Sequence, residues 1–241
     1  MKFYRRLQPI TAISFDLDDT LYANYPIMVN AEQKMLVYFS EHFPQTASQG
    51  EQACQQYWHK FRTQALTLDP LLVHDVTALR LESYYLAIKA LGIESQLARQ
   101  QAQDALAYFI GQRSDFSLPE KSKCLLALLK QYFPLVAITN GNVDFNKLGL
   151  KDYFQAIYYP GSGVKRKPSE DMFMQACQQL QINPSQLLHV GDCGHADIYG
   201  ALQAGCQTAW LNRYSVGKAI KVLPHFEITT IEQLSVLAKR T

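Results

Sequence analysis

Three aspartates stand close together near the start of the chain, directly after a short apolar run. Asp16, Asp18 and Asp19 follow the segment 10–15, and Thr20 comes next. Such carboxylates could attack an electrophile, exchange protons or hold a divalent cation that prefers oxygen ligands. A solvated acidic turn has the same composition. The spacing D-x-D-x-T therefore predicts a reactive site only if other segments bring polar groups to the same place.

Further polar residues close two apolar segments in the second half of the chain. Thr139 and Asn140 end one of them, and Asp192, followed by Asp197, ends the other. Lys167 lies between them, before a proline at the start of a predicted helix. Taken singly, a threonine that caps a helix or a lysine at the surface is the more ordinary interpretation. The complete set, in this order, makes these residues candidates for one site.

The surrounding segments alternate between strand and helix patterns. Short apolar runs predict strands at 10–15, 135–139, 156–159, 187–190 and 208–211. Helical spacing predicts helices through 125–129, at 169–180 and at 198–204. This order is typical of an α/β fold, a Rossmann-like doubly wound parallel sheet. Because ligands of such sheets bind beyond the carboxyl ends of the strands, we expect the polar residues to meet at that edge.

A long helical stretch separates the first predicted strand from the others. Apolar residues recur there at helical spacing, as in Met28, Met35 and Phe39, and turn residues divide the stretch into about four helices. The first strand must still join the sheet, so the stretch is interpreted as an insertion. We expect a Rossmann-like catalytic core of residues 1–21 and 116–241 and an α-helical cap of residues 22–115.

Composition excludes several classes of partner. The 241 residues are 48% hydrophobic and 18% charged, as in an ordinary globular protein. A net charge of +2 offers no broad basic field for nucleic acid or an acidic membrane. No apolar run approaches the roughly 20 residues that span a bilayer. Five scattered cysteines suggest neither a disulfide framework nor a zinc site, so we expect a reducing cytoplasm. The oligomeric state stays open.

The four groups of polar residues resemble the motifs of the haloacid dehalogenase-like superfamily. Those motifs are D-x-D-x-T, a serine or threonine after the second strand, a lysine, and G-D-x-x-x-x-D. One D-x-D-x-T alone is a weak signal, whereas four motifs in order are a strong one. The resemblance implies a Mg²⁺-dependent phosphatase. The position of the helical insertion implies a cap of the kind that restricts substrates to small phosphorylated metabolites.

The resemblance also implies separate roles for the acidic residues. Asp16 is the expected nucleophile, which forms an aspartyl-phosphate, and Asp18 is the expected general acid and base. Mg²⁺ is expected between Asp16, the backbone carbonyl of Asp18 and Asp192. A cation is required because a carboxylate that approaches a phosphate dianion meets repulsion of several kcal/mol at about 4 Å.

The remaining motif residues are expected to hold the phosphoryl group or to support the site. The Thr139 hydroxyl, the Asn140 backbone N–H and the Lys167 ammonium would bind phosphoryl oxygens. Thr20 would fix the first loop, and Asp197 would orient either the metal shell or Lys167.

Four neighbouring residues leave questions open. Lys165 is an alternative to Lys167, although Lys-Pro at a helix start matches the family better. Cys193 stands where many relatives carry a second acidic residue, and we interpret it as a small buried side chain. His189 is expected to be a hydrogen-bonded core residue, and His195 has no assigned role.

Beyond its motifs, the chain is similar from end to end to bacterial phosphatases of riboflavin synthesis. The parallel segments are Phe3-Tyr4-Arg5, Thr20-Leu21-Tyr22, His74-Asp75-Val76-Thr77, 134–142, Lys167-Pro168, 187–192 and Leu223-Pro224-His225. This similarity implies 5-amino-6-(5-phospho-D-ribitylamino)uracil and FMN as substrates. Other members of the superfamily act as sugar-phosphate phosphatases or phosphomutases, and these remain alternatives. A dehalogenase is disfavoured by Asp18, and a non-catalytic binding protein by the complete motif set.

The expected cap offers several candidates for substrate recognition. His74, Asp75 and Arg80 are polar groups on an apolar helix, for which a salt-bridged structural face is the more ordinary interpretation. Tyr22 and Tyr25 could stack on a flavin or uracil ring, but with 14 tyrosines in the chain neither is singled out.

Overall fold

The computed structural model describes residues 1–212 and 222–239, which form two compact units. The first, called the sheet unit, holds residues 1–24, 117–141 and 145 onward, and the second, called the helical unit, holds 25–116 and 142–144. Within the described residues, no helix is long and apolar enough to cross a membrane.

The sheet unit is built around a sheet in which the described strands follow the order β1-β7-β6-β5-β2-β3-β4. These strands are β1 (Lys2–Phe3), β2 (Ala12–Phe15), β3 (Leu135–Ile138), β4 (Ala156–Tyr158), β5 (Leu187–Gly191), β6 (Gln207–Leu211) and β7 (Phe226–Ile228). All neighbours are parallel except β1 and β7, which are antiparallel. The α/β fold class is confirmed, and the sheet is mixed at one edge. The two-residue strand β1 carries no periodicity by which it could have been predicted.

Helices pack on the sheet because their apolar residues fall on one side. In α6 (Asp171–Leu180), Met172, Phe173, Ala176 and Cys177 are buried, and they pack in one cluster with residues of β2, β3 and α7 (Gly200–Gln203). The described part of the sheet unit also contains the α-helix α5 (Glu120–Leu129). Its 3₁₀ helices are η3 (Leu150–Asp152), η4 (Pro184–Gln186) and the longer η6 (Ile231–Lys239). The predicted helix 198–204 begins earlier than expected, in the π-helical segment η5 (Gly194–Tyr199), which leads into α7.

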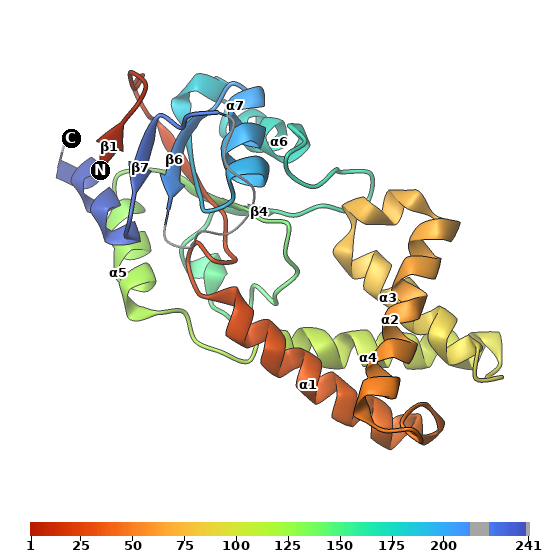
Figure 1. The fold of residues 1–241 in the computed structure, drawn as a ribbon. Helices are drawn as coiled ribbons and strands as arrows, with labels where there is room; N and C mark the ends of the chain where they lie inside the picture. Colours follow the sequence, from red (N-terminus) through yellow and green to blue (C-terminus); the bar gives the residue numbers. More distant parts are fainter. Residues whose placement is uncertain (213–221, 240–241) are drawn as a thin grey trace. The chain divides into compact units, whose positions relative to one another are not determined.

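The helical unit contains four long helices and two short turns, drawn from red to yellow-green in Figure 1. They are α1 (Asn24–His42), η1 (Pro44–Thr46), α2 (Glu51–Leu68), η2 (Pro70–His74), α3 (Val76–Lys89) and α4 (Ser95–Arg113). Aromatic rings dominate their shared core: Phe39 stacks on Trp58 with centroids 3.6 Å apart, and Tyr84 meets Phe39 edge-on at 5.2 Å. Such rings bury large apolar areas, which stabilises the bundle without a sheet.

A cavity of about 380 Å³ opens between α1, α2 and α3 in this unit. Its walls combine the aromatic residues Phe39, Trp58 and Tyr84 with the guanidinium groups of Arg62 and Arg80. The volume falls in the range of small-molecule pockets.

Candidate active site

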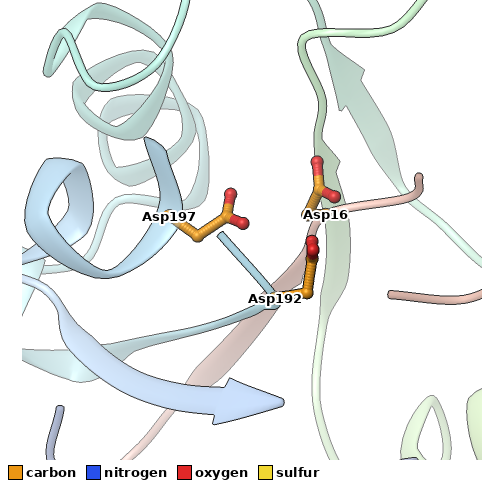
Figure 2. A group of neighbouring side chains, drawn as sticks. All are labelled: Asp16, Asp192 and Asp197. Atoms are coloured by element: carbon orange, nitrogen blue, oxygen red, sulfur yellow. The ribbon is translucent and has the colours of Figure 1, made fainter. Parts of the chain in front are cut away.

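Three strand ends carry the acidic and hydroxyl residues singled out above. Asp16 follows β2, Thr139 follows β3, and Asp192 follows β5. Because β3, β2 and β5 are parallel neighbours, their carboxyl ends lie at one edge of the sheet. Figure 2 shows the carboxylates of Asp16, Asp192 and Asp197 facing one another, with a ligand oxygen from each within 4.8 Å of the others.

Lys167 reaches this cluster from the loop before α6. Its side chain is 1% exposed, and Nζ donates to Asp16 Oδ1 at 2.7 Å, to Asp197 Oδ1 at 2.6 Å and to the Ile138 carbonyl at 2.5 Å. All three N–H donors of the ammonium therefore have acceptors. Lys165, the alternative, is exposed, and its backbone N–H donates to Asp171. The geometry therefore brings Lys167, and not Lys165, to the aspartates.

The cluster has more negative than positive charge, and the pKa values reflect this. Burial raises the pKa of Asp16 well above its usual range; Lys167 offsets part of this rise, and Asp197 and Asp192 add to it. Burial, together with Asp197 and Asp19, raises the pKa of Asp192 to about 7. Three carboxylates face one ammonium, so a divalent cation would relieve their repulsion.

Asp197 contacts three donors, whereas Asp16 contacts Lys167 and Thr20, and Asp192 contacts Thr20. Oδ1 accepts from Lys167 and lies 3.2 Å from His189 Nε2, and Oδ2 accepts from the Cys193 N–H at 2.9 Å. Burial alone would raise its pKa, but Lys167 and His189 hold the pKa of Asp197 below the usual range. Lys167, His189 and the Cys193 N–H thus balance the charge of Asp197, and Asp16 shares Lys167 with it.

The close packing within the last motif, G-D-x-x-x-x-D, depends on its glycine. A Cβ on Gly191 would overlap the Asp197 side chain, so no larger residue fits at the end of β5 without displacing that carboxylate. The carbonyl of Asp192 is fixed by the Trp210 indole N–H, which donates to it at 2.8 Å. Cys193 caps η5 through a hydrogen bond that its sulfur accepts from Ala196 N–H.

The loop after β2 has contacts that the sequence did not predict. The Tyr22 hydroxyl donates to Asp18 Oδ1 at 2.7 Å, and Tyr22 is buried, so it is no stacking surface. Asp19 adopts a positive φ of 58°, which aspartate tolerates better than most residues, and its carboxylate accepts from Asn24 N–H at the start of α1. Thr20 Oγ1 lies 3.4 Å from Asp16 Oδ2 and 3.3 Å from Asp192 Oδ1.

Asn140 joins two of the motif loops through its side chain. Its amide nitrogen donates to the Lys167 carbonyl at 3.0 Å, and its amide oxygen accepts from the Lys167 N–H at 2.8 Å. Thr139 is buried beside it, and its hydroxyl accepts from Gly141 N–H at 3.0 Å. The sequence drew attention only to the backbone N–H of Asn140, because a reciprocal amide pair between distant residues leaves no local pattern.

The candidates for substrate recognition in the helical unit mainly contact other residues of that unit. Asp75 caps α3 by accepting from the N–H groups of Thr77 and Ala78. Arg80 donates to Glu32 at 2.9 Å and to Tyr84 at 3.0 Å. Tyr25 is 78% exposed, and His195 is also exposed and stacks on Tyr199. His74 Nδ1 is buried, with no hydrogen-bond partner among the described residues.

Comparisons with known proteins show what the whole chain is similar to. Residues 10–205 match the family described as haloacid dehalogenase-like hydrolases. Over 98% of its length, and all of the relative's, the chain is 34% identical to 5-amino-6-(5-phospho-D-ribitylamino)uracil phosphatase YigB of Escherichia coli strain K12. Pyrimidine 5'-nucleotidase YjjG of the same organism is 32% identical to this chain, in a match that covers 42% of this chain and 47% of the nucleotidase. A solved structure of a 2-haloacid dehalogenase from Pseudomonas syringae pv. Tomato DC3000 has a TM-score of 0.87 and 31% identity, and the match covers 96% of this chain and 100% of that one.

Proposed function

The chain belongs to the haloacid dehalogenase-like hydrolase family, and we propose that it hydrolyses small phosphate monoesters through a covalent intermediate on Asp16. It is a phosphoric monoester hydrolase, as its phosphatase relatives indicate. The observation that carries the mechanism is the buried contact of Lys167 with Asp16, beside Asp192 at the ends of adjacent parallel strands.

The reaction follows from what the side chains can do. An Asp16 oxygen attacks phosphorus, the ester oxygen leaves with a proton from Asp18, and an aspartyl-phosphate forms. Asp18 then removes a proton from the water that attacks phosphorus, which releases inorganic phosphate and restores Asp16. Thr139, Lys167 and the Asn140 backbone N–H stabilise the charge on the phosphoryl oxygens. Tyr22 holds the Asp18 carboxylate in place through the 2.7 Å hydrogen bond.

The buried carboxylates fit Mg²⁺ as the cofactor. Asp16 and Asp192 belong to one buried group of carboxylates. Together with the backbone carbonyl of Asp18 they would hold the ion through oxygen atoms, while Thr20 and Asp197 would support them. When bound, the ion screens the repulsion between the attacking carboxylate and the phosphate.

We assign 5-amino-6-(5-phospho-D-ribitylamino)uracil and FMN as the substrates. The similarity to the Escherichia coli phosphatase over nearly the whole of both chains supports the first of these.

A substrate screen tests this function. The protein is assayed with both flavin-pathway phosphates, a panel of sugar phosphates and 2-chloropropionate, with and without Mg²⁺, and kcat/KM is compared. We expect phosphate release that requires Mg²⁺, is highest for the flavin-pathway compounds and needs no bisphosphate activator. Higher kcat/KM on sugar phosphates would refute the substrate assignment, and chloride release without phosphate release would refute the reaction.

A further inference from the structure

His189 and Ser14 form a buried pair in neighbouring strands, and the proposed reaction assigns no role to either residue. The parallel register of β2 and β5 places Ser14 opposite His189, and both are fully buried. Ser14 Oγ lies 2.9 Å from His189 Nδ1, and the Phe173 ring meets the imidazole edge-on at 5.0 Å. The ring is thus held on two sides, which fixes where its other nitrogen points.

The surroundings of the imidazole determine its tautomer. Nε2 lies 3.2 Å from the Asp197 carboxylate, which can only accept a hydrogen bond, so Nε2 carries the proton. Burial lowers the pKa of His189 in spite of this hydrogen bond, so the ring is neutral at physiological pH. Nδ1 is then an acceptor, and the Ser14 hydroxyl donates to it.

The chain of contacts continues from His189 to the nucleophile. The same Asp197 oxygen that faces His189 accepts from Lys167, whose ammonium also donates to Asp16. Without the imidazole, Oδ1 of Asp197 would keep only Lys167 as a donor, while Oδ2 would keep the Cys193 N–H, so Oδ1 would be held less firmly. A lysine in a buried site depends on such fixed partners, because a small displacement changes how it meets the phosphoryl group.

We propose that His189 is a positioning residue for phosphoryl transfer, which fixes Asp197 so that this carboxylate aims Lys167 at Asp16. The Ser14 hydroxyl, which can donate to Nδ1, is compatible with this tautomer and holds the other side of the ring. This inference rests on the proposed function, because it assigns a role within the same reaction.

Two substitutions at His189 separate positioning from packing. His189→Leu removes the Nε2–H donor, whereas His189→Gln keeps an N–H at a similar distance along the side chain. With Mg²⁺ and p-nitrophenyl phosphate, we expect kcat of His189→Leu to fall about 10–100-fold, with KM within about threefold of the wild type. His189→Gln should recover to within about fivefold. The matched control is Thr208→Val, in the adjacent strand at the same register, which should stay within about twofold of the wild type.

The opposite results would overturn the inference. These are a folded His189→Leu protein with kcat within threefold of the wild type, or a His189→Gln protein as impaired as His189→Leu. ¹⁵N NMR of the imidazole in metal-free wild-type protein gives a reading that depends neither on activity nor on the folding of a variant. We expect the proton on Nε2, and a proton on Nδ1 alone would contradict the inference. If the wild type hydrolyses no phosphate ester while its proton is on Nε2, the proposed function fails and the hydrogen-bond geometry stands.

Discussion

Tyr22 holds Asp18, the proposed acid and base of the reaction, through a single hydroxyl. It donates to Asp18, and Tyr22→Phe removes this donor while keeping the buried ring. We expect kcat for FMN to fall about 3–10-fold, because its alcohol leaves with a proton, and kcat for p-nitrophenyl phosphate to fall less than about twofold. The control is Tyr4→Phe, which removes a similar 2.7 Å hydrogen bond to Glu227. Equal losses on both substrates would contradict the role of Tyr22.

The raised pKa of Asp192 predicts how the stability of the metal-free protein depends on pH. Its pKa is raised from 3.8 to about 7, first by burial, so the folded state favours the protonated form. The stability that protonation provides is present below about pH 4 and is lost as pH rises through about 7. Asp192→Asn should therefore raise the thermal midpoint of unfolding by a few degrees at pH 8 and by clearly less at pH 5, as measured by calorimetry.

Asp197 is the matched control, because the same substitution there should act in the opposite direction. Burial would raise its pKa, but Lys167 and His189 lower it, so the charged carboxylate stabilises the fold at both pH values. Asp197→Asn weakens a buried ion pair, whose disruption costs about 3–5 kcal/mol. We expect a lower midpoint at pH 5 and at pH 8. Midpoints that shift in the same direction for both variants at pH 8 would refute this assignment of charges.

At the scale of elements, the turn from β5 into η5 depends on the absence of a side chain at Gly191. A methyl group there would occupy the space of the Asp197 carboxylate. Gly191→Ala should lower kcat about 100-fold, because the displaced carboxylate no longer aims Lys167. Gly111→Ala in α4 is the control: a Cβ there meets nothing within 4 Å, and alanine in a helix interior stabilises by about 0.5–1 kcal/mol. A Gly191→Ala protein with full activity would show that the turn tolerates the methyl group.

The strand ends could be predicted from the sequence because hydrophobic patterns and motif order are local signals. Asp16, Thr139 and Asp192 each follow a short buried run, and the parallel order brings those runs together. Of the partners of Lys167, Asp197 was one of two expectations, whereas the contacts with Asp16 and the Ile138 carbonyl could not be predicted, since they join positions far apart in the chain.

Other elements could not be predicted from sequence patterns, for different reasons. The strand β1 is too short to show an alternating pattern, and its partner β7 is only three residues long. The segment η5 was hidden because its glycine, histidine and aspartate do not follow helical hydrophobic spacing. The roles of Tyr22 and Ser14 depend on hydroxyl contacts that any tyrosine or serine could make, so only the fold identifies them.

For the whole molecule, the residues of the proposed chemistry all lie in the sheet unit, which contains Asp16, Lys167 and Asp192. The helical unit has a cavity of its own, lined by Trp58, Tyr84 and two arginines.

The covalent role of Asp16 can be tested directly by trapping the intermediate. Wild-type protein is mixed with FMN and Mg²⁺, quenched with acid during turnover, digested and mapped by mass spectrometry. We predict a phosphoryl group on the peptide that contains Asp16, and its loss on longer incubation after FMN is consumed. The Asp16→Asn variant should be folded, with neither the adduct nor turnover. Turnover by Asp16→Asn, or a phosphoryl group trapped on another residue, would contradict Asp16 as the nucleophile.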